Sequence, residues 1–305
     1  MTPGTTVALA TLIGTLSRFV FLKVDYRQYP SYPQGYLIHL SLGAIAAFLG
    51  AVAIPALASK DFAAATFLAL AAQQFREIRN LERTGLENLE EIELVPRGPA
   101  YIEGIARAFE ARNYIAMFTS LLTSGVLYLV QASGLLKVSL AVFLSLLLVL
   151  YLRDSLRGAR VGDYAEITPA QLSFKGSVLY VDEIIIMNVG SPQAREKILK
   201  HGLGAVLTPR DINARVTLAN VGQRQAIVHD LATILGIRRD QDEPEFTPMA
   251  RLDHDSGKVG VFTIPVNKDA EAMRVAIAHV PLLESAKRRP SSAISGRLAA
   301  RRSGR

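Results

Sequence analysis

Two short stretches combine glycine with a residue type that caps helices, and each stands where we expect a helix to begin. They are residues 188–192 (NVGSP) and residues 220–223 (NVGQ). Free N–H groups at a helix N-terminus attract anions, and glycine allows a ligand to approach the backbone closely. The pattern predicts a phosphate or nucleotide site at these junctions, with Gly190 and Ser191 as the candidate residues of the first and Asn220, Gly222 and Gln223 as those of the second. Ordinary capping by Ser191 and Asn220 explains both stretches equally well, so that alternative stays open.

The usual signatures of catalysis and of metal binding are absent from the sequence. There is no GxxxxGK[ST] phosphate loop, no HExxH zinc motif and no GxSxG nucleophile motif, and there is no cysteine for thiolate chemistry. His229 and Asp230 resemble the dyad of metal-dependent phosphohydrolases, but the other histidines lack the spacing that further ligands need. We therefore interpret this pair as part of a helix surface and predict no metal site. No cofactor and no catalytic residue is indicated, and the sequence leans against an enzyme.

A group of polar and charged residues follows a break at residues 96–99 (PRGP), where proline and glycine restrict the backbone. The group consists of Tyr101, Glu103, Gly104 and Arg107. A helix start favours a carboxylate through the local dipole, so capping is one role for Glu103. The other role is binding, or coupling to the C-terminal domain. We expect residues 101–106 to dock against that domain, with Glu103 meeting a basic residue or backbone N–H groups.

Apolar segments in the first half of the chain predict a multi-span α-helical membrane bundle over residues 1–160. An α-helix needs about 20 apolar residues to cross the ~30 Å of hydrocarbon in a bilayer. The predicted spans are residues 5–24, 37–58, 62–75, 114–131 and 135–152, of which 62–75 is a short span or a re-entrant helix. Arg18 is the only charge well inside a span, and we expect its side chain to reach the nearby interface. The loop between the third and fourth spans, residues 76–113, begins with an amphipathic helix.

Lysine and arginine residues between the spans predict the orientation, because such residues are retained on the cytosolic side. With five spans and the C-terminus inside, eleven of them fall on cytosolic segments and two, Lys60 and Lys137, fall outside. If residues 62–75 do not cross, the split becomes ten to three. Both arrangements predict a multi-pass protein of the cell membrane with a cytoplasmic C-terminus.

Short β-rich runs alternate with helical stretches over residues 161–286, which predicts a cytosolic α+β domain. One candidate arrangement is a ferredoxin-like sandwich. The tail, residues 287–305, carries seven basic residues and no acid, and the rest of the chain has 27 basic and 27 acidic residues. This composition is typical of a disordered end, for which anionic membrane lipid is the first functional partner and nucleic acid the least favoured.

Three segments carry a resemblance to a known family. Residues 101–106 spell YIEGIA, residues 195–236 run from REKILKHG to LATILG, and residues 242–253 read DEPEFTPMARLD. Together they resemble the YIEGIA family of bacterial membrane proteins of unknown function. The resemblance implies the two-part architecture and an association with endospore-forming bacteria. It implies no activity and supplies no catalytic residues.

Three functions remain open at this point. The first is a membrane-anchored regulatory, sensing or scaffold protein whose cytosolic domain meets a small anionic ligand or a protein partner. The second is a transporter or channel component, although the spans contain few polar residues and almost no paired ionisable groups. The third is a membrane-bound enzyme acting on a lipid or phosphorylated substrate, which would need a pocket that includes Glu103, Arg107 and a basic anion site.

Overall fold

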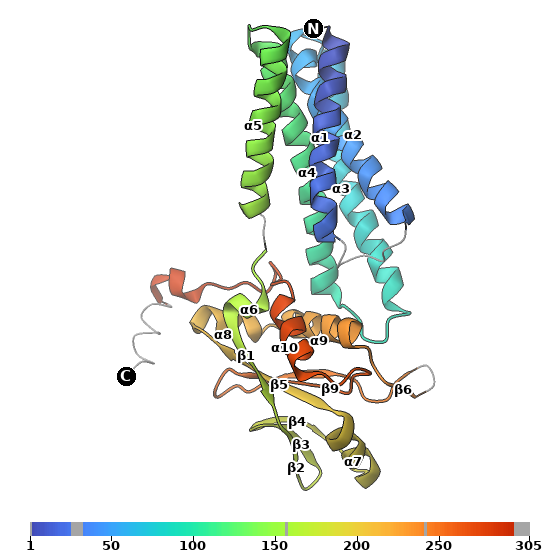
Figure 1. The fold of residues 1–305 in the computed structure, drawn as a ribbon, viewed down its shortest axis with the longest axis vertical. Coiled ribbons are helices and arrows are strands. Elements are labelled where there is room, and N and C mark those ends of the chain that lie inside the picture. Colours follow the sequence, from blue (N-terminus) through green and yellow to red (C-terminus); the bar gives the residue numbers. More distant parts are fainter. Residues whose placement is uncertain (1, 26–32, 156–157, 241–242, 296–305) are drawn as a thin grey trace. The chain divides into compact units, whose positions relative to one another are not determined.

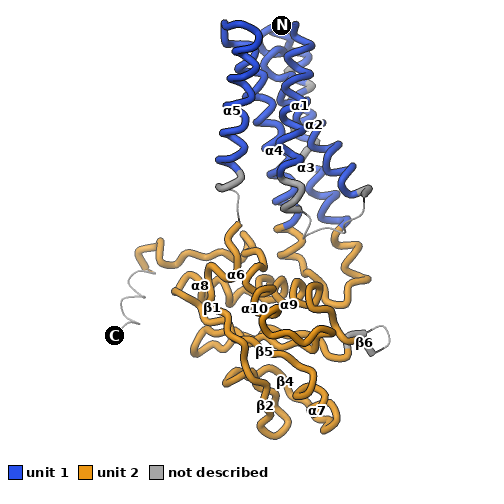
Figure 2. The backbone as a smooth tube through the Cα atoms, in the orientation of Figure 1, with its two compact units in different colours: residues 1–85, 105–157 blue, residues 86–104, 158–305 orange. Residues whose placement is uncertain are grey.

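The protein, seen in a computed structural model, is described over residues 2–25, 33–155, 158–240 and 243–295. It divides into two compact units, which Figure 2 shows in different colours. Unit 1 comprises Met1–Gly85 and Ile105–Arg157, and unit 2 comprises Leu86–Gly104 and Gly158–Arg305. This division differs from the predicted one at residue 160, because part of the loop assigned to the membrane half belongs with the C-terminal domain.

Unit 1 is made of helices that approach one another through small residues. The helices are α1 (Pro3–Asp25), α2 (Pro33–Ala58), α3 (Phe62–Glu90), α4 (Pro99–Leu129) and α5 (Gly134–Ser155), of which α3 and α4 also extend into unit 2. A Cβ atom added at Gly14 would lie 2.7 Å from Cβ of Ala47 and 2.8 Å from the carbonyl oxygen of Ala116. Glycine at this position therefore allows α1 to pack closely on both α2 and α4.

Two helices in the described part of the chain are long and apolar enough to cross a membrane, judged by length and composition. They are Gly35–Ala58, with a mean hydropathy of 2.2, and Gly134–Leu152, with a mean hydropathy of 2.5. The stretch Phe62–Ala71 is also apolar but shorter than a span. The fold is mostly helical with an α+β sheet portion, and the five-span bundle remains a proposal.

Two helices extend beyond the predicted spans. The third span and the amphipathic stretch after it form one continuous helix, α3, although Gly85 stands near its end. No atom lies within 4 Å of a Cβ added at Gly85, so this glycine is in open space, where it is tolerated at a cost of about 1 kcal/mol relative to alanine. Helix α4 likewise begins at Pro99, so the predicted fourth span continues from the YIEGIA residues without a break. Proline suits the first turn of a helix, where its missing N–H leaves no bond unmade.

Unit 2 is built around a four-stranded antiparallel sheet in the order β1-β5-β9-β8. Its strands are β1 (Ala165–Ala170), β5 (Leu203–Pro209), β9 (Val259–Thr263) and β8 (Met249–Leu252). A second antiparallel sheet consists of β2 (Leu172–Lys175), β3 (Val178–Val181) and β4 (Ile184–Asn188). The remaining elements are α6 (Val161–Tyr164), α7 (Pro192–His201), α8 (Ile212–Leu218), α9 (Val221–Leu235), β6 (Arg239–Asp240), β7 (Glu243–Pro244) and α10 (Ala270–His279).

The central strands are apolar along their length because the four-stranded sheet is covered on both faces. All five residues of β9 are buried. The second sheet covers one face, where a Cβ added at Gly260 would lie 3.0 Å from Ile184 and 3.1 Å from Ile186. Helices α9 and α10 lie on the other face (Figure 1), where Ile227 and Ile277 are fully buried. The resulting layers are three-stranded sheet, four-stranded sheet and helices.

The α+β class is confirmed for this unit, but the ferredoxin-like arrangement is wrong. That arrangement contains a split βαβ unit, in which two parallel strands are separated by a third. Here β1 and β5 are direct neighbours and antiparallel, with the whole second sheet and α7 between them in the chain. Strand order depends on such long-range pairings, which the local apolar runs do not specify.

The predicted tail does not begin as a disordered segment. The backbone N–H of Arg288 donates to Thr217 Oγ1 at 3.3 Å, and Ser291 donates to Asn213 Oδ1 through its backbone N–H at 3.1 Å. Ser291 belongs to a 3₁₀ turn, Pro290–Ser292, that these contacts hold against α8. The prediction of disorder is therefore wrong for residues 287–292, and residues 296–305 lie outside the described part of the chain.

Candidate functional site

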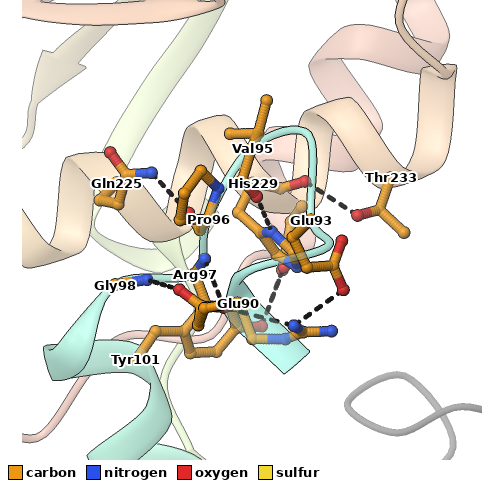
Figure 3. A network of polar contacts seen from close by, with 11 residues as sticks. Glu90, Glu93, Val95, Pro96, Arg97, Gly98, Tyr101, Gln225, His229 and Thr233 are labelled. Atoms are coloured by element: carbon orange, nitrogen blue, oxygen red, sulfur yellow. Dashed lines mark hydrogen bonds and ion pairs between the residues drawn. The ribbon is translucent and has the colours of Figure 1, made fainter. Parts of the chain in front are cut away.

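The stretch of residues 86–104, which contains the end of α3, the loop after it and the first turns of α4, is held in shape by one carboxylate. We refer to it as the connecting segment. Glu90 accepts hydrogen bonds from the backbone N–H groups of Arg97 at 3.0 Å and of Gly98 at 2.9 Å (Figure 3). The guanidinium of Arg97 lies 3.4 Å from Glu90 and 2.9 Å from Glu93. Gly98 has a φ of +82°, in the left-handed region that favours glycine, so the chain turns here before α4 begins.

Side chains of α9 hold the backbone of the connecting segment. The Nδ1 atom of His229 donates to the carbonyl oxygen of Val95 at 2.6 Å, and Gln225 Nε2 donates to the carbonyl oxygen of Pro96 (Figure 3). Gln225 and His229 are four residues apart and therefore lie on the same face of the helix. Val95 is buried in a cluster with Val228 and two other apolar residues of unit 2, Ala232 and Ile237. The segment is therefore part of the core of this unit.

A side-chain contact also joins Tyr101 of the connecting segment to Asp230 of α9. The phenolic O–H of Tyr101 donates to the carboxylate, whose oxygens lie at 2.9 and 3.1 Å. Tyr101 is only 3% exposed, and its ring packs edge-on against His229 with the ring centroids 6.1 Å apart. Burial, together with the charge of Asp230 and the hydrogen bond to it, raises the pKa of Tyr101 well above the ordinary value for tyrosine. The phenol therefore stays protonated and acts as a donor.

The beginning of α4 also fills the space beside the N-terminus of α9. A Cβ atom added at Gly222 would lie 2.5 Å from Cβ of Ala100, so the missing side chain makes room for the first turn of α4. Asn220 caps α9 by accepting from the backbone N–H of Gln223 at 3.1 Å. Gln223 is fully buried; its Nε2 donates to the carbonyl oxygen of Pro281 and its Oε1 accepts from the backbone N–H of Leu283.

The two glycine-containing helix starts are not brought together. Gly190 and Ser191 open α7, which lies beside the second sheet and away from α9 (Figure 1). Ser191 caps α7 by accepting from the backbone N–H of Ala194 at 3.3 Å. At the start of α9, the position where we predicted a ligand near Gly222 is occupied by Ala100. Capping and helix packing therefore explain these residues, and a phosphate or nucleotide site at either helix start stays a prediction.

The other residues of the polar group are placed differently from one another. Glu103 is half-buried in the first turns of α4 and belongs to unit 2, whereas Arg107 is exposed and belongs to unit 1. A Cβ added at Gly104 would make an ordinary 3.5 Å contact with Leu283. Tyr101 contacts the C-terminal domain through Asp230, and Ile102 beside it is buried, while the predicted contact of Glu103 stays a prediction.

The comparisons with known proteins bear on the same segments. A family model described as YIEGIA protein matches residues 6–293. The chain belongs to the YIEGIA family. A relative from Bacillus subtilis (strain 168), named Uncharacterized protein YphB, is 44% identical over 288 residues, which cover 94% of this chain and 95% of the relative. No solved structure matches. The family resemblance in the sequence is confirmed, and the match includes both the YIEGIA residues and α9.

Three partners of the YIEGIA segment were missed in the sequence. Gln225, His229 and Asp230 all contact residues 95–101, whereas we had interpreted the His-Asp pair as a helix surface feature. His229 bonds to the carbonyl oxygen of Val95, and Asp230 accepts from Tyr101. No group of three potential metal ligands occurs among the described residues. The available signal was the helical spacing of Gln225 and His229 together with Asp230, which places three hydrogen-bonding side chains close together on one helix.

Arg18 is a second residue whose environment differs from the expectation. Its side chain is fully buried inside unit 1 of this YIEGIA-family chain, where we had expected it to reach the interface. The Nη2 atom donates to Nδ1 of His39 at 3.2 Å. The guanidinium carbon lies 5.5 Å from the centre of the Phe109 ring, close enough for a cation–π contact. An ionisable group in such a position is costly and therefore merits a functional explanation.

Proposed function

We propose that this YIEGIA-family protein is a membrane-anchored regulatory, sensing or scaffold protein. Unit 1 anchors the chain in the cell membrane through the five spans, and unit 2 is cytosolic and meets a small ligand or a protein partner. The two long apolar helices and the distribution of lysine and arginine support the anchor and its orientation. A role linked to sporulation belongs to the same proposal, because the family resemblance implies endospore-forming bacteria.

The observation that carries this proposal is the composition of unit 2. Its core takes in the connecting segment, which comes before most of α4 and all of α5 in the chain, as well as residues 158–295, which follow them. The segment is held by Gln225, His229 and Asp230, all from one helix. If the helices of unit 1 served only to tether unit 2 to the membrane, the core of unit 2 would not need a segment that lies between two of those helices in the chain. Because the segment leads directly into α4, a ligand that shifts α9 would act on the start of that helix.

Reporter fusions test the membrane anchor and its orientation. We expect a reporter that is active only in the cytosol to be active when fused after Asp163 and at the C-terminus. The motive is the excess of basic residues on the segments assigned to the inside. A reporter fused after Lys60 serves as the opposite control and should report the outside in the five-span arrangement. An outside signal at Asp163 would contradict the proposal.

Hydrogen exchange on the full chain in lipid nanodiscs tests the coupling. Tyr101→Phe removes the donor to Asp230 and leaves the ring in place. We expect faster exchange both in the connecting segment and in α9, because the contact stabilises both. Tyr180→Phe, on β3 away from this contact, is the matched control and should leave both segments unchanged. Faster exchange confined to residues 99–104 would show that the segment is only a structural support.

A transporter or channel component remains the second candidate, favoured by the interior of unit 1. The spans contain more buried polar groups than we expected from their composition. Thr123 shares a hydrogen bond with Ser145 at 2.8 Å, and Ser124 donates to the carbonyl oxygen of Ala51 at 2.7 Å. Arg18 and His39 are paired in the same unit. Ion flux into liposomes that contain the purified chain distinguishes this candidate from the first, for which we expect no flux above that of protein-free liposomes.

A further inference from the structure

Two arginine side chains of unit 2 are anchored at β8, an edge strand of the four-stranded sheet. Arg224, in the first turn of α9, donates from Nη1 to the carbonyl oxygen of Ala250 at 3.1 Å. Arg251, the next residue along the strand, donates from Nε to the carbonyl oxygen of Ile186 on β4 at 3.2 Å. One guanidinium therefore bonds to the carbonyl group directly before the residue that carries the other.

The spacing of residues on α9 places Arg224 over this part of the strand. Val228, four residues later on the same face of the helix, is buried in a cluster against which Ala250 packs. The side chain of Arg224 is half-buried, and its Nε is enclosed without a hydrogen-bond partner among the described residues. A buried donor without an acceptor is costly, so packing alone does not explain an arginine at this position.

No carboxylate of the described residues neutralises this pair of charges. Neither arginine takes part in an ion pair within that part of the chain. Burial, and then the positive charge of Arg251, lower the pKa of Arg224. Asp253, the nearest acid along the strand, accepts from Ser256 in the turn that follows. Arginine stays protonated near neutral pH, so two like charges are held close together and repel, and a bound anion would remove that cost.

The donors that are left favour a phosphate group over other anions. Arg224 retains Nη2, and Arg251 retains both Nη atoms, without a protein acceptor in the described residues. Two guanidinium groups can share the three oxygens of a terminal phosphate, whereas the two oxygens of a carboxylate are already satisfied by one arginine. A phosphate monoester carries about −1.5 to −2 charges at pH 7, which balances two guanidinium groups.

We propose that Arg224 and Arg251 bind the phosphate group of a phosphate monoester. The ester is either a small soluble compound or the headgroup of phosphatidic acid, since both present the same terminal phosphate. The bound anion joins α9 to β8. Because α9 also holds the connecting segment through Gln225 and His229, the site names the ligand chemistry of unit 2 and rests on the proposed function for its biological role.

Two titrations of the full chain in lipid nanodiscs distinguish the two sources. In phosphatidylcholine nanodiscs, calorimetry with sn-glycerol 3-phosphate tests the soluble source. Nanodiscs that contain phosphatidic acid test the lipid source through amide hydrogen exchange. In whichever arm the ligand binds, we expect slower exchange in both α9 and β8, because a ligand of the folded state stabilises the elements that it joins. Exchange in α7 should not change.

Substitutions at the two arginines test the assignment of the site. Arg251→Gln should weaken binding roughly tenfold or more, because charged hydrogen bonds to the phosphate are lost. Arg251→Lys keeps the charge but not the fork, so it should weaken binding as well. Arg195→Gln is the matched control, since Arg195 on α7 also donates to a backbone carbonyl oxygen, that of Gly176 at 2.8 Å. It should bind as the wild-type chain does.

Arg224→Gln should show the same loss as Arg251→Gln, and the exposed Arg251 keeps the test available if the half-buried position does not tolerate the change. Absence of binding and of slower exchange in both arms would overturn the proposal. Binding that Arg251→Gln leaves unchanged, or that Arg195→Gln weakens equally, would overturn it as well. Neither result would alter the exchange expected from Tyr101→Phe or the reporter signals, so this site and the proposed function can fail separately.

Discussion

The tripeptide Asn-Val-Gly occurs at residues 188–190 and again at residues 220–222, and the two copies have different surroundings. Gly190, before α7, is exposed, and a Cβ added there would meet no atom within 4 Å. Gly222, in the first turn of α9, would bring its Cβ to 2.5 Å from Ala100. Both helices are capped by a side chain, α7 by Ser191 and α9 by Asn220. The local sequence therefore satisfies a backbone N–H group of the first turn in each case. Among the residues that the structure describes, a distant part of the chain lies against Gly222 but not against Gly190.

The difference shows how a local signal can be satisfied in two ways. A glycine near a helix start permits close approach, but it does not determine what approaches. At α9 the partner is the first turn of α4, brought there by Tyr101, Gln225 and His229. At α7 the described residues bring no such segment. The anion site predicted from the shared pattern requires free N–H groups at the helix start. At the start of α9, the first turn of α4 packs against the helix and a side chain caps it.

The largest effect should come from removing Asp230, which holds the connecting segment through Tyr101. We expect Asp230→Ala to lower the free energy of opening of α9 by roughly 1.5–3 kcal/mol, because a buried phenol loses a charged acceptor. Amide hydrogen exchange of the full chain in nanodiscs measures this quantity. Glu196→Ala, on the exposed surface of α7, is the control and should change stability by less than about 0.5 kcal/mol. Equal effects at both positions would remove the contrast between the two helices.

The second effect comes from the two glycines themselves. Gly222→Ala should destabilise α9 by about 1–3 kcal/mol, because the added methyl group overlaps Ala100 unless α4 moves. Gly190→Ala should be neutral or slightly stabilising, because it restricts the unfolded chain and meets no neighbour. The same exchange experiment compares them directly. If both substitutions are neutral, the close approach of Ala100 is not required for the packing of α9.

The third effect depends on pH and on the burial of Tyr101. Its folded-state pKa is raised above the unfolded value of about 10. The associated stability is fully present below pH 10 and is lost as the pH rises through the folded-state pKa, by about 1.4 kcal/mol per pH unit. We therefore expect the stability difference between wild type and Tyr101→Phe to shrink above pH 10. Urea unfolding of both chains at pH 9 and at roughly pH 11 checks this, and a constant difference would show that the phenol is accessible to solvent.

Local signals predicted most of unit 2 but not its assembly. The starts of α7 and α9 were predicted from capping residues and from a nearby glycine or proline, which act within a few positions. The order of the strands was missed, because β1 pairs with β5 across an inserted sheet. In unit 1 the predicted span ended at residue 75, where the apolar run ends, whereas α3 continues to Glu90 because a helix does not end where its residues become polar.

The candidate site was predicted in part for the same reason. Tyr101 and Gly222 were selected from their local motifs, and both take part in the contact. Their partners were missed, since Tyr101 and Asp230 are 129 residues apart and Val95 and His229 are 134 apart. A single histidine or aspartate on a helix has no feature that identifies a partner at that distance. Arg18 was likewise assigned to the interface, because its contacts with His39 and Phe109 depend on how three helices meet.

The smallest effect concerns the caps, in which the two helix starts should be alike. Asn220→Ala and Ser191→Ala each remove one acceptor for a backbone N–H of the first turn, which typically costs about 0.5–2 kcal/mol. Solvent replaces part of the lost bond at the exposed start of α7, so we expect about 0.5–1 kcal/mol there and a similar value at α9.

Combining each cap variant with the alanine substitution at the nearby glycine separates the effect of capping from the effect of helix packing. The effects should add at residues 190 and 191, which have no shared partner. At residues 220 and 222 they should not add, because the Cβ of Gly222→Ala would also lie 3.2 Å from Asn220 Oδ1 and so disturb the cap itself. Simple additivity at both helices would mean that the cap and the close approach of Ala100 are independent at α9.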